Sequence, residues 1–325
     1  MIDFKRGLKE YALEDVRNFL SRGVGNRILN HEDMLICIRN NYINVYLNGC
    51  SLLKYSPLAT DDKKYLIHHK YMGLDLGNKG PYIPLEYDGN DLFYNGKSFT
   101  DRVIEKSTEE LMSYINKNGE KRYLAQYLKS SPRPFLIDLE IAFTRERTAE
   151  EKKNGKKETV ADRIDMAVLE EDNGRIILRM IEVKIDYDSR LKSQEEGKQE
   201  ILKQMNNYKN EFLGKQYQNI LDSYRLVADN YLQLGIAHKL NENNPEQVLK
   251  KFISNANQSL ESLEPKSKPG DDFALDMDPY LLVIITDDKN MKGRNNICHF
   301  KRLQNEFFKS RYPLPQSWSS DQRIP

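Results

Sequence analysis

Three ionisable side chains in the middle of the chain have the types and the spacing of a cation-binding site. Asp165 lies in the segment DRIDMAVLEE, and Glu182 and Lys184 lie in the segment RIILRMIEVK that follows it. Between them stands Asn173-Gly174, the pair preferred in a two-residue type I′ turn, because both turn positions need a positive φ. The numbers of opposed residues in such a hairpin sum to a constant, so Asp165 is expected to face Glu182.

Two opposed carboxylates repel each other unless a positive charge lies between them. Magnesium meets this need because it is a hard cation that prefers oxygen ligands, here Asp165, Glu182, a main-chain carbonyl such as that of Val183, and a phosphate oxygen. Lys184 shares a strand face with Glu182, where its ammonium could orient or help deprotonate a metal-bound water, or neutralise charge that develops on the phosphate. The trio favours hydrolysis of a phosphodiester.

The order of these features resembles the PD-(D/E)XK, or restriction-endonuclease-like, nuclease superfamily. The segments RIDMAVL and MIEVK look like its signature, and the resemblance covers roughly residues 105 to 290. It implies a mixed central β-sheet flanked by helices, magnesium or manganese as the metal, and cleavage of nucleic acid. A proline before the first aspartate is often absent in the family, and here Ile164 takes that place, so the acidic pair and the lysine carry the resemblance.

The resemblance also extends to a helix and to an earlier strand. Gln204 and Tyr208, one turn apart, are similar to the Gln and Tyr that many of these nucleases place on the helix after the lysine, which implies a catalytic role for Gln204; the pair fits a surface hydrogen bond and a core aromatic equally well. Several members add a metal-binding glutamate before the first aspartate. Glu140, or Asp138 on the same strand face, could fill that role, or either could point to solvent.

The elements predicted around these residues form an α/β (α+β) pattern with a restriction-endonuclease-like core. Besides the hairpin, FLIDLEIAF and YLLVIITDD are typical of buried or half-buried strands. Apolar residues at helical spacing predict helices over about 107–128, 191–212, 217–234, 246–262 and 296–310. We expect a nuclease-like domain over residues 105–325, with a helical insertion at about 215–278.

Residues 1–104 are predicted to form a small β-rich N-terminal domain. After a helix over 8–22, the segments MLICIRN, INVYLNG, SLLKYS and KYLIHHK are typical of an antiparallel meander. Residues 72–100 are rich in Gly, Pro, Asp and Asn and are expected to form irregular loops, and the tail from Ser310 has too many breakers for regular structure. From its position, this domain is expected to recognise substrate, a partner subunit or a second copy.

The composition constrains the partners only weakly. The chain has 325 residues with 50 Lys and Arg against 49 Asp and Glu, so any phosphate-binding face must be local. Three scattered cysteines are too few for a disulfide framework or a zinc site of paired cysteines. The N-terminus lacks the apolar run of a signal peptide, and the longest aliphatic stretch, YLLVII, is too short to span a bilayer, so we expect no membrane contact and a cytoplasmic location.

We therefore expect a magnesium-dependent nuclease, an endonuclease rather than an exonuclease, with DNA favoured as substrate. Cutting a duplex needs two sites or two events, so a homodimer is expected, and microbial restriction or defence is the setting that the family most often implies. Two alternatives stay open. One is a catalytically silent binding module on the same fold, and the other is an enzyme that cleaves RNA.

Overall fold

The chain folds into two compact units, each built from separate stretches of sequence. The computed structural model describes residues 4–69, 82–106, 109, 111, 113, 119–130, 134–146, 159–172, 174–186, 188–191, 200–240, 243–258, 275–285 and 316–319. The first unit comprises Met1–Lys5, Ser130–Arg225 and Lys251–Pro325, and the second comprises Arg6–Lys129 and Leu226–Lys250. The division thus falls near residue 129 instead of 104, and part of the predicted insertion belongs with the N-terminal residues.

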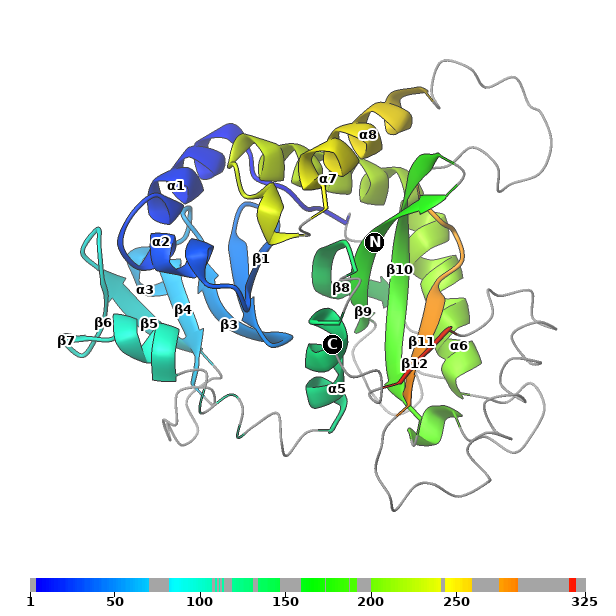
Figure 1. The fold of residues 1–325 in the computed structure, drawn as a ribbon, viewed down its shortest axis with the longest axis horizontal. Coiled ribbons are helices and arrows are strands. Elements are labelled where there is room, and N and C mark those ends of the chain that lie inside the picture. The colour runs from blue at the N-terminus through cyan, green and yellow to red at the C-terminus, as the bar shows by residue number, and fades with distance from the viewer. Residues whose placement is uncertain are drawn as a thin grey trace. The chain divides into compact units, whose positions relative to one another are not determined.

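The first unit is built on a mixed β-sheet (Figure 1). Its five strands, in the order β12-β11-β10-β9-β8, are β8 (Leu136–Glu146), β9 (Thr159–Asp172), β10 (Arg175–Ile185), β11 (Tyr280–Ile285) and β12 (Gln316–Ser319). β8, β9 and β10 run antiparallel, whereas β11 is parallel to β10 and β12 is parallel to β11. The tail was expected to lack regular structure; four of its residues instead form β12, because the edge of β11 supplies hydrogen-bonding partners that a local pattern does not reveal.

The β9–β10 hairpin has the predicted register. Its ladder runs from Arg175 opposite Asp172 to Ile181 opposite Met166, the pairing that a two-residue turn at 173–174 requires. Gly174 has a φ of 79°, as that turn demands, and Asn173 lies outside the described residues. The next pair along the ladder would be Asp165 and Glu182. The register therefore delivers the two carboxylates to neighbouring positions of adjacent strands.

Helices of the first unit lie over one part of this sheet. They are η3 (Ser189–Leu191), α6 (Glu200–Asn207), the π-helical η4 (Tyr208–Leu213) and the first part of α7 (Gly214–Gln233). Phe143 of β8 stacks on Phe212 with ring centroids 4.2 Å apart and meets Tyr208 edge-on at 5.8 Å. This aromatic contact anchors η4 against β8, so the preceding α6 is held beside the hairpin.

The second unit contains an antiparallel sheet of seven strands in sequence order. The strands are β1 (Met34–Ile38), β2 (Ile43–Leu47), β3 (Cys50–Tyr55), β4 (Tyr65–His68), β5 (Tyr82–Tyr87), β6 (Leu92–Tyr94) and β7 (Lys97–Ser98). The helices with it are α1 (Glu10–Leu20), α2 (Gly23–Asn30), α3 (Asp61–Lys64), η2 (Arg102–Lys106), α5 (Gly119–Leu128), the later part of α7, η5 (Ala237–Lys239) and the start of α8 (Pro245–Gln258). The meander predicted from four apolar segments is confirmed as β1 to β4.

The prediction of irregular loops over 72–100 is wrong for the described part of that range. Strands β5, β6 and β7 occupy it, and Ile83 and Leu85 are buried while Pro84 and Glu86 point outward. The glycines lie in the turns that connect these strands, where Gly89 and Gly96 have φ values of 103° and 70°. The residue types that predicted irregular loops thus form the tight turns between short strands. The helix expected at 296–310, and most of 107–118, lie outside the described residues.

Candidate active site at the β9–β10 hairpin

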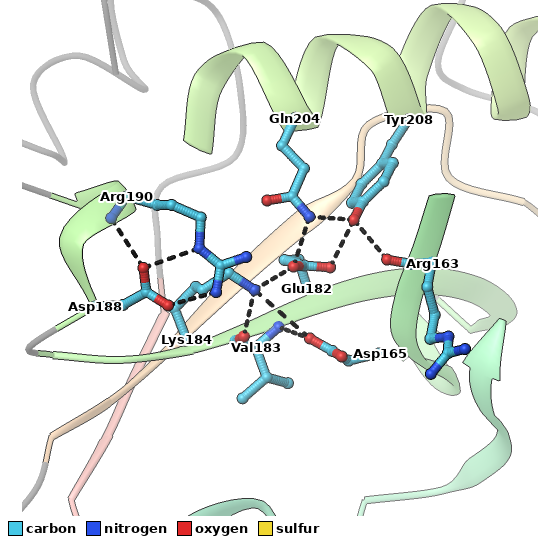
Figure 2. A network of polar contacts seen from close by, with 9 residues as sticks. All are labelled: Arg163, Asp165, Glu182, Val183, Lys184, Asp188, Arg190, Gln204 and Tyr208. Carbon is cyan, nitrogen blue, oxygen red and sulfur yellow. Dashed lines mark hydrogen bonds and ion pairs between the residues drawn. The ribbon is translucent and has the colours of Figure 1, made fainter. Parts of the chain in front are cut away.

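Asp165, Glu182 and Lys184 come together at one end of the hairpin (Figure 2). The Lys184 ammonium donates a hydrogen bond to Glu182 Oε1, and its Nζ lies 3.9 Å from Asp165 Oδ2. The lysine and the glutamate side chains are only 2% and 3% exposed, whereas the aspartate is 19% exposed. Asp165 is therefore the acid through which the group reaches solvent.

The main chain of Val183 completes this arrangement. Its N–H donates to Asp165 Oδ2 at 2.8 Å, and its carbonyl oxygen accepts from Lys184 Nζ at 2.9 Å. The ammonium consequently lies among a carboxylate oxygen of Glu182, the Val183 carbonyl and, at longer range, Asp165. These are the three groups that the sequence assigned to a metal ion, so one positive charge is already placed where a cation is needed.

Gln204 and Tyr208 reach the same glutamate from the helix side. Gln204 Nε2 donates to Glu182 Oε1 at 2.8 Å and also to the Tyr208 hydroxyl. That hydroxyl lies 3.0 Å from Glu182 Oε2 and 2.6 Å from the Arg163 carbonyl, and its single proton can go to one of them at a time. Both oxygens of Glu182 thus lie within hydrogen-bonding distance of a protein donor. Gln204 contacts Glu182 instead of forming a surface hydrogen bond, and Tyr208 is a buried aromatic, as one of the two readings expected.

The surroundings of Glu182 disfavour its charged form. Burial, and then the nearby charge of Asp165, raise the pKa of Glu182 to about 7, although Lys184 acts in the opposite direction. Burial, followed by the charge of Glu182, also raises the pKa of Tyr208, so its hydroxyl keeps its proton. Near neutral pH the glutamate can therefore hold or release a proton, and an added cation would favour release.

The two candidates for an additional acid on β8 have different surroundings. Asp138 is 1% exposed, and its carboxylate accepts from the Leu139 N–H and from the Tyr224 hydroxyl, each at 2.8 Å. Glu140 is half-buried, lies 3.5 Å from Arg163 Nη1 and has a φ of 49°, which is rare for a residue other than glycine. Asp138 is thus engaged in the core, and Glu140 is the more accessible of the two.

The described residues do not gather a larger set of metal ligands. Within them, no three His, Cys, Asp or Glu side chains stand close enough together to hold a metal ion. Glu140 is accordingly not brought to Asp165 and Glu182 in this arrangement. What the chain does offer is a set of hard oxygens, two carboxylates and the Val183 carbonyl, which suits magnesium when water and phosphate oxygens supply the remaining positions.

An ion pair near Lys184 escaped the sequence reasoning. Arg190 in η3 donates through Nε and Nη2 to the two carboxylate oxygens of Asp188, at 2.9 and 2.5 Å. Burial acts to raise the pKa of Asp188, but the Arg190 hydrogen bonds and the charge of Lys184 outweigh it, and the pKa is lowered. The feature of the sequence that could have indicated this ion pair is its position, because both residues follow Lys184 within six positions.

No protein family, curated protein or solved structure matches this chain. The fold described above places it among proteins that mix α-helices with β-sheets, one sheet mixed and the other antiparallel. In the described part of the chain, no helix combines the length and the apolar character that crossing a membrane requires.

Proposed function

We propose that this chain is a metal-dependent nuclease with a PD-(D/E)XK, restriction-endonuclease-like core, and that DNA is its substrate. One observation carries the proposal. Asp165 and Glu182 stand on adjacent antiparallel strands with the Lys184 ammonium in contact with one and 3.9 Å from the other. A buried ammonium is costly unless opposite charges compensate it, and here the two acids do so.

The proposed roles follow from these contacts. Asp165, Glu182 and the Val183 carbonyl would hold magnesium, or manganese in its place, and the bound metal would polarise the phosphate and lower the pKa of a water molecule. Lys184 would neutralise charge near the attacked phosphate. Gln204 and Tyr208 hold the Glu182 carboxylate in place through both its oxygens.

Metal and ammonium would compete for the same oxygens. Lys184 Nζ contacts Glu182 Oε1 and the Val183 carbonyl, which are two of the three proposed ligands. When a metal takes these oxygens, the lysine has to give up at least one contact, and its ammonium becomes available to a water or a phosphate. The lysine thus serves as the counter-ion of the acids until the metal arrives.

A second candidate function is a silent binding module. The observation that favours it is the closure of the network: both oxygens of Glu182 accept from protein donors, and Lys184 is almost fully buried. In that case the trio holds the hairpin together without binding metal. A homodimer, a partner subunit bound through the N-terminal residues, a cytoplasmic location and a role in microbial defence are further parts of the proposal. Cleavage of RNA instead of DNA is the alternative to it.

The test is cleavage of plasmid DNA, single-stranded DNA and RNA in the presence of magnesium, manganese or EDTA. Asp165→Asn and Lys184→Met should each lower the rate by about 10²-fold or more, as removal of transition-state stabilisation does. Glu171→Gln is the matched control, since Glu171 is on the same strand as Asp165, β9, and forms an exposed ion pair with Lys251. Cleavage that survives both substitutions would overturn the assignment of the site.

A measurement of metal binding distinguishes the two candidate functions, the nuclease and the silent binding module. Calorimetric titration with magnesium should show weaker binding for Asp165→Asn than for the unchanged protein and for Glu171→Gln. Equal affinity in all three proteins, together with no cleavage, would favour the silent module.

A further inference from the structure

The Asp188–Arg190 ion pair lies beside the proposed nuclease site, and none of the proposed roles involves it. Both residues follow Lys184 in the chain, where β10 ends and the short helix η3 begins. Figure 2 shows the pair on one side of the acids and Arg163 on the other. The charge of Lys184 contributes to the lowered pKa of Asp188, so the two side chains lie within range of each other's charge.

Three donors of Arg190 converge on the Asp188 carboxylate. The Arg190 main-chain N–H and Nε each donate to Asp188 Oδ1 at 2.9 Å, and Nη2 donates to Oδ2 at 2.5 Å. The Asp188 side chain is only 10% exposed, and its lowered pKa keeps it ionised at neutral pH. The carboxylate therefore fixes both the position and the plane of the guanidinium.

The segment that carries this pair is itself fixed to the end of β10. The Asp188 N–H donates to the Ile185 carbonyl at 2.9 Å, and the Leu191 N–H donates to the Asp188 carbonyl at 3.1 Å. The Leu191 side chain is buried. Because Ile185 is the last residue of the strand that carries the proposed site, the fold sets the distance between Arg190 and that site.

Arg190 is the member of the pair that reaches solvent. Its side chain is 34% exposed, against 10% for Asp188. A guanidinium carries five N–H groups in a planar fork, so a carboxylate bound at one edge orients the rest of the group. An arginine oriented in this way suits a phosphate, which it can bind through parallel hydrogen bonds with little further loss of side-chain entropy.

We propose that Arg190 binds a backbone phosphate of the nucleic acid next to the phosphate that is cleaved, and that Asp188 positions it. The inference rests on the proposed nuclease function, because it requires a substrate that lies over Asp165 and Lys184. The contact holds the strand in register at the site and takes no part in breaking the bond. A phosphate contact is independent of base sequence, so the effect applies to every substrate sequence.

Fluorescence anisotropy of the full chain tests this contact, with a labelled oligonucleotide of the type that the protein cleaves and with calcium in place of magnesium. Arg190→Gln should weaken binding about tenfold. It should also reduce the slope of log K against log salt concentration by about 0.7 to 0.9, because one phosphate contact is lost. Arg190→Lys keeps the charge and should restore the slope.

Asp188→Asn separates positioning from charge. This variant keeps Arg190 and removes a negative charge near the phosphate, so binding should not weaken. The cleavage rate at saturating substrate should instead fall about tenfold, because the phosphate is no longer held in register. Arg175→Gln is the matched control, since Arg175 is an exposed arginine at the other end of β10, about 30 Å along the strand from Lys184. Circular dichroism melts verify that each variant is folded.

The results separate this inference from the proposed function. If the unchanged protein cleaves with magnesium but Arg190→Gln keeps its affinity and salt slope, the phosphate contact is refuted and the nuclease assignment stands. An equal change in Arg175→Gln also refutes the contact, because total charge would then explain the loss. If the unchanged protein neither binds nor cleaves any nucleic acid, the proposed function fails and the inference fails with it.

Discussion

At the scale of single residues, the position of the Lys184 ammonium explains how two acids tolerate burial beside each other. It contacts Glu182 and the Val183 carbonyl and lies 3.9 Å from Asp165. A buried acid pair without a counter-ion would have to bind a proton or draw in water. The lysine therefore has a structural role in the metal-free protein in addition to any catalytic role.

Lys184→Met tests this double role. The change leaves the acids without their counter-ion, and the free energy of unfolding without metal should fall by about 3 kcal/mol. Added magnesium should then raise the melting temperature more in the variant than in the unchanged protein, because metal replaces the lost charge. Thermal melts with magnesium and with EDTA measure both effects. Lys215→Met, which removes an exposed helical ion pair with Glu211, is the control; the same magnesium shift in all three proteins would contradict the idea.

The raised pKa of Glu182 predicts how stability depends on pH. Its ordinary value is 4.5 and its value in the folded protein is about 7, so between these two values the native state holds a proton that the unfolded chain has released. The free energy of unfolding of the metal-free protein should therefore decrease as pH rises from about 4.5 to about 7, by as much as about 3 kcal/mol. Urea denaturation across this range measures the slope. In Glu182→Gln the slope should be smaller, and an unchanged slope would show that another group is responsible.

At the scale of elements, two helical segments each bring a tyrosine to a buried acid, with different expected consequences. Tyr208 of η4 meets Glu182, and Tyr224 of α7 donates to Asp138 at 2.8 Å. The first contact belongs to the candidate active site. The second fastens α7 to β8 in the core of the first unit.

Substitution of each tyrosine by phenylalanine separates these roles. Tyr224→Phe leaves Asp138 with one donor fewer and should lower the free energy of unfolding by about 1–3 kcal/mol without changing the cleavage rate of the folded protein. Tyr208→Phe should lower the cleavage rate by about tenfold, because Glu182 loses one of the groups that orient it. Urea denaturation and plasmid cleavage are measured on both. A larger loss of cleavage in Tyr224→Phe would reverse the assignment.

The turn of the β9–β10 hairpin allows a test of conformation alone. Gly174 has a φ of 79°, and a Cβ added there would meet no atom within 4 Å. Gly174→Ala should therefore cost about 1 kcal/mol of stability through backbone strain, and Gly174→Asn should cost less, because Asn tolerates this conformation better. Chemical denaturation measures the difference. Equal losses in the two variants would indicate that the turn conformation is not what sets the cost.

At the scale of the whole molecule, the chain crosses between its two units more than once. Asn230 and Tyr231, in the later part of α7, belong to the second unit. The Asn230 side chain accepts from the Leu8 N–H at 2.7 Å and donates to the Leu8 carbonyl at 3.2 Å, and the Tyr231 hydroxyl donates to the Ile36 carbonyl. Residues predicted to be an insertion in the nuclease-like domain are thus bound to the N-terminal residues.

A fragment of residues 105–325 tests this organisation. It keeps Asn230 and Tyr231 but loses Leu8 and Ile36, so buried polar groups and apolar surface of α7 become exposed. The fragment should melt with less cooperativity than the full chain, and limited proteolysis should cut first within residues 226–250. A cooperative melt at the temperature of the full chain would show that the boundary predicted at residue 104 is the functional one.

The hairpin was predictable because its determinants are local. A turn pair that needs positive φ and side chains that alternate along a strand fix which residues oppose each other, and this was enough to bring Asp165, Glu182 and Lys184 to one place. The four apolar segments of the N-terminal meander could be read for the same reason. Strands β5 to β7 could not be predicted in this way, since they are short and are separated by turns that contain glycine and asparagine.

Contacts between segments that are far apart in the sequence could be identified only in the folded chain. Glu182 meets Gln204 and Tyr208 across 22 and 26 residues, and Asp138 meets Tyr224 across 86. The sequence favoured Glu140 over Asp138 but left both possible, and burial against α7 showed that Asp138 is engaged in the core. The division into two units and the pairing of β12 with β11 likewise depend on which surfaces meet. Local periodicity sets the direction in which a side chain points, but its partner is set by packing, which is a property of the whole chain.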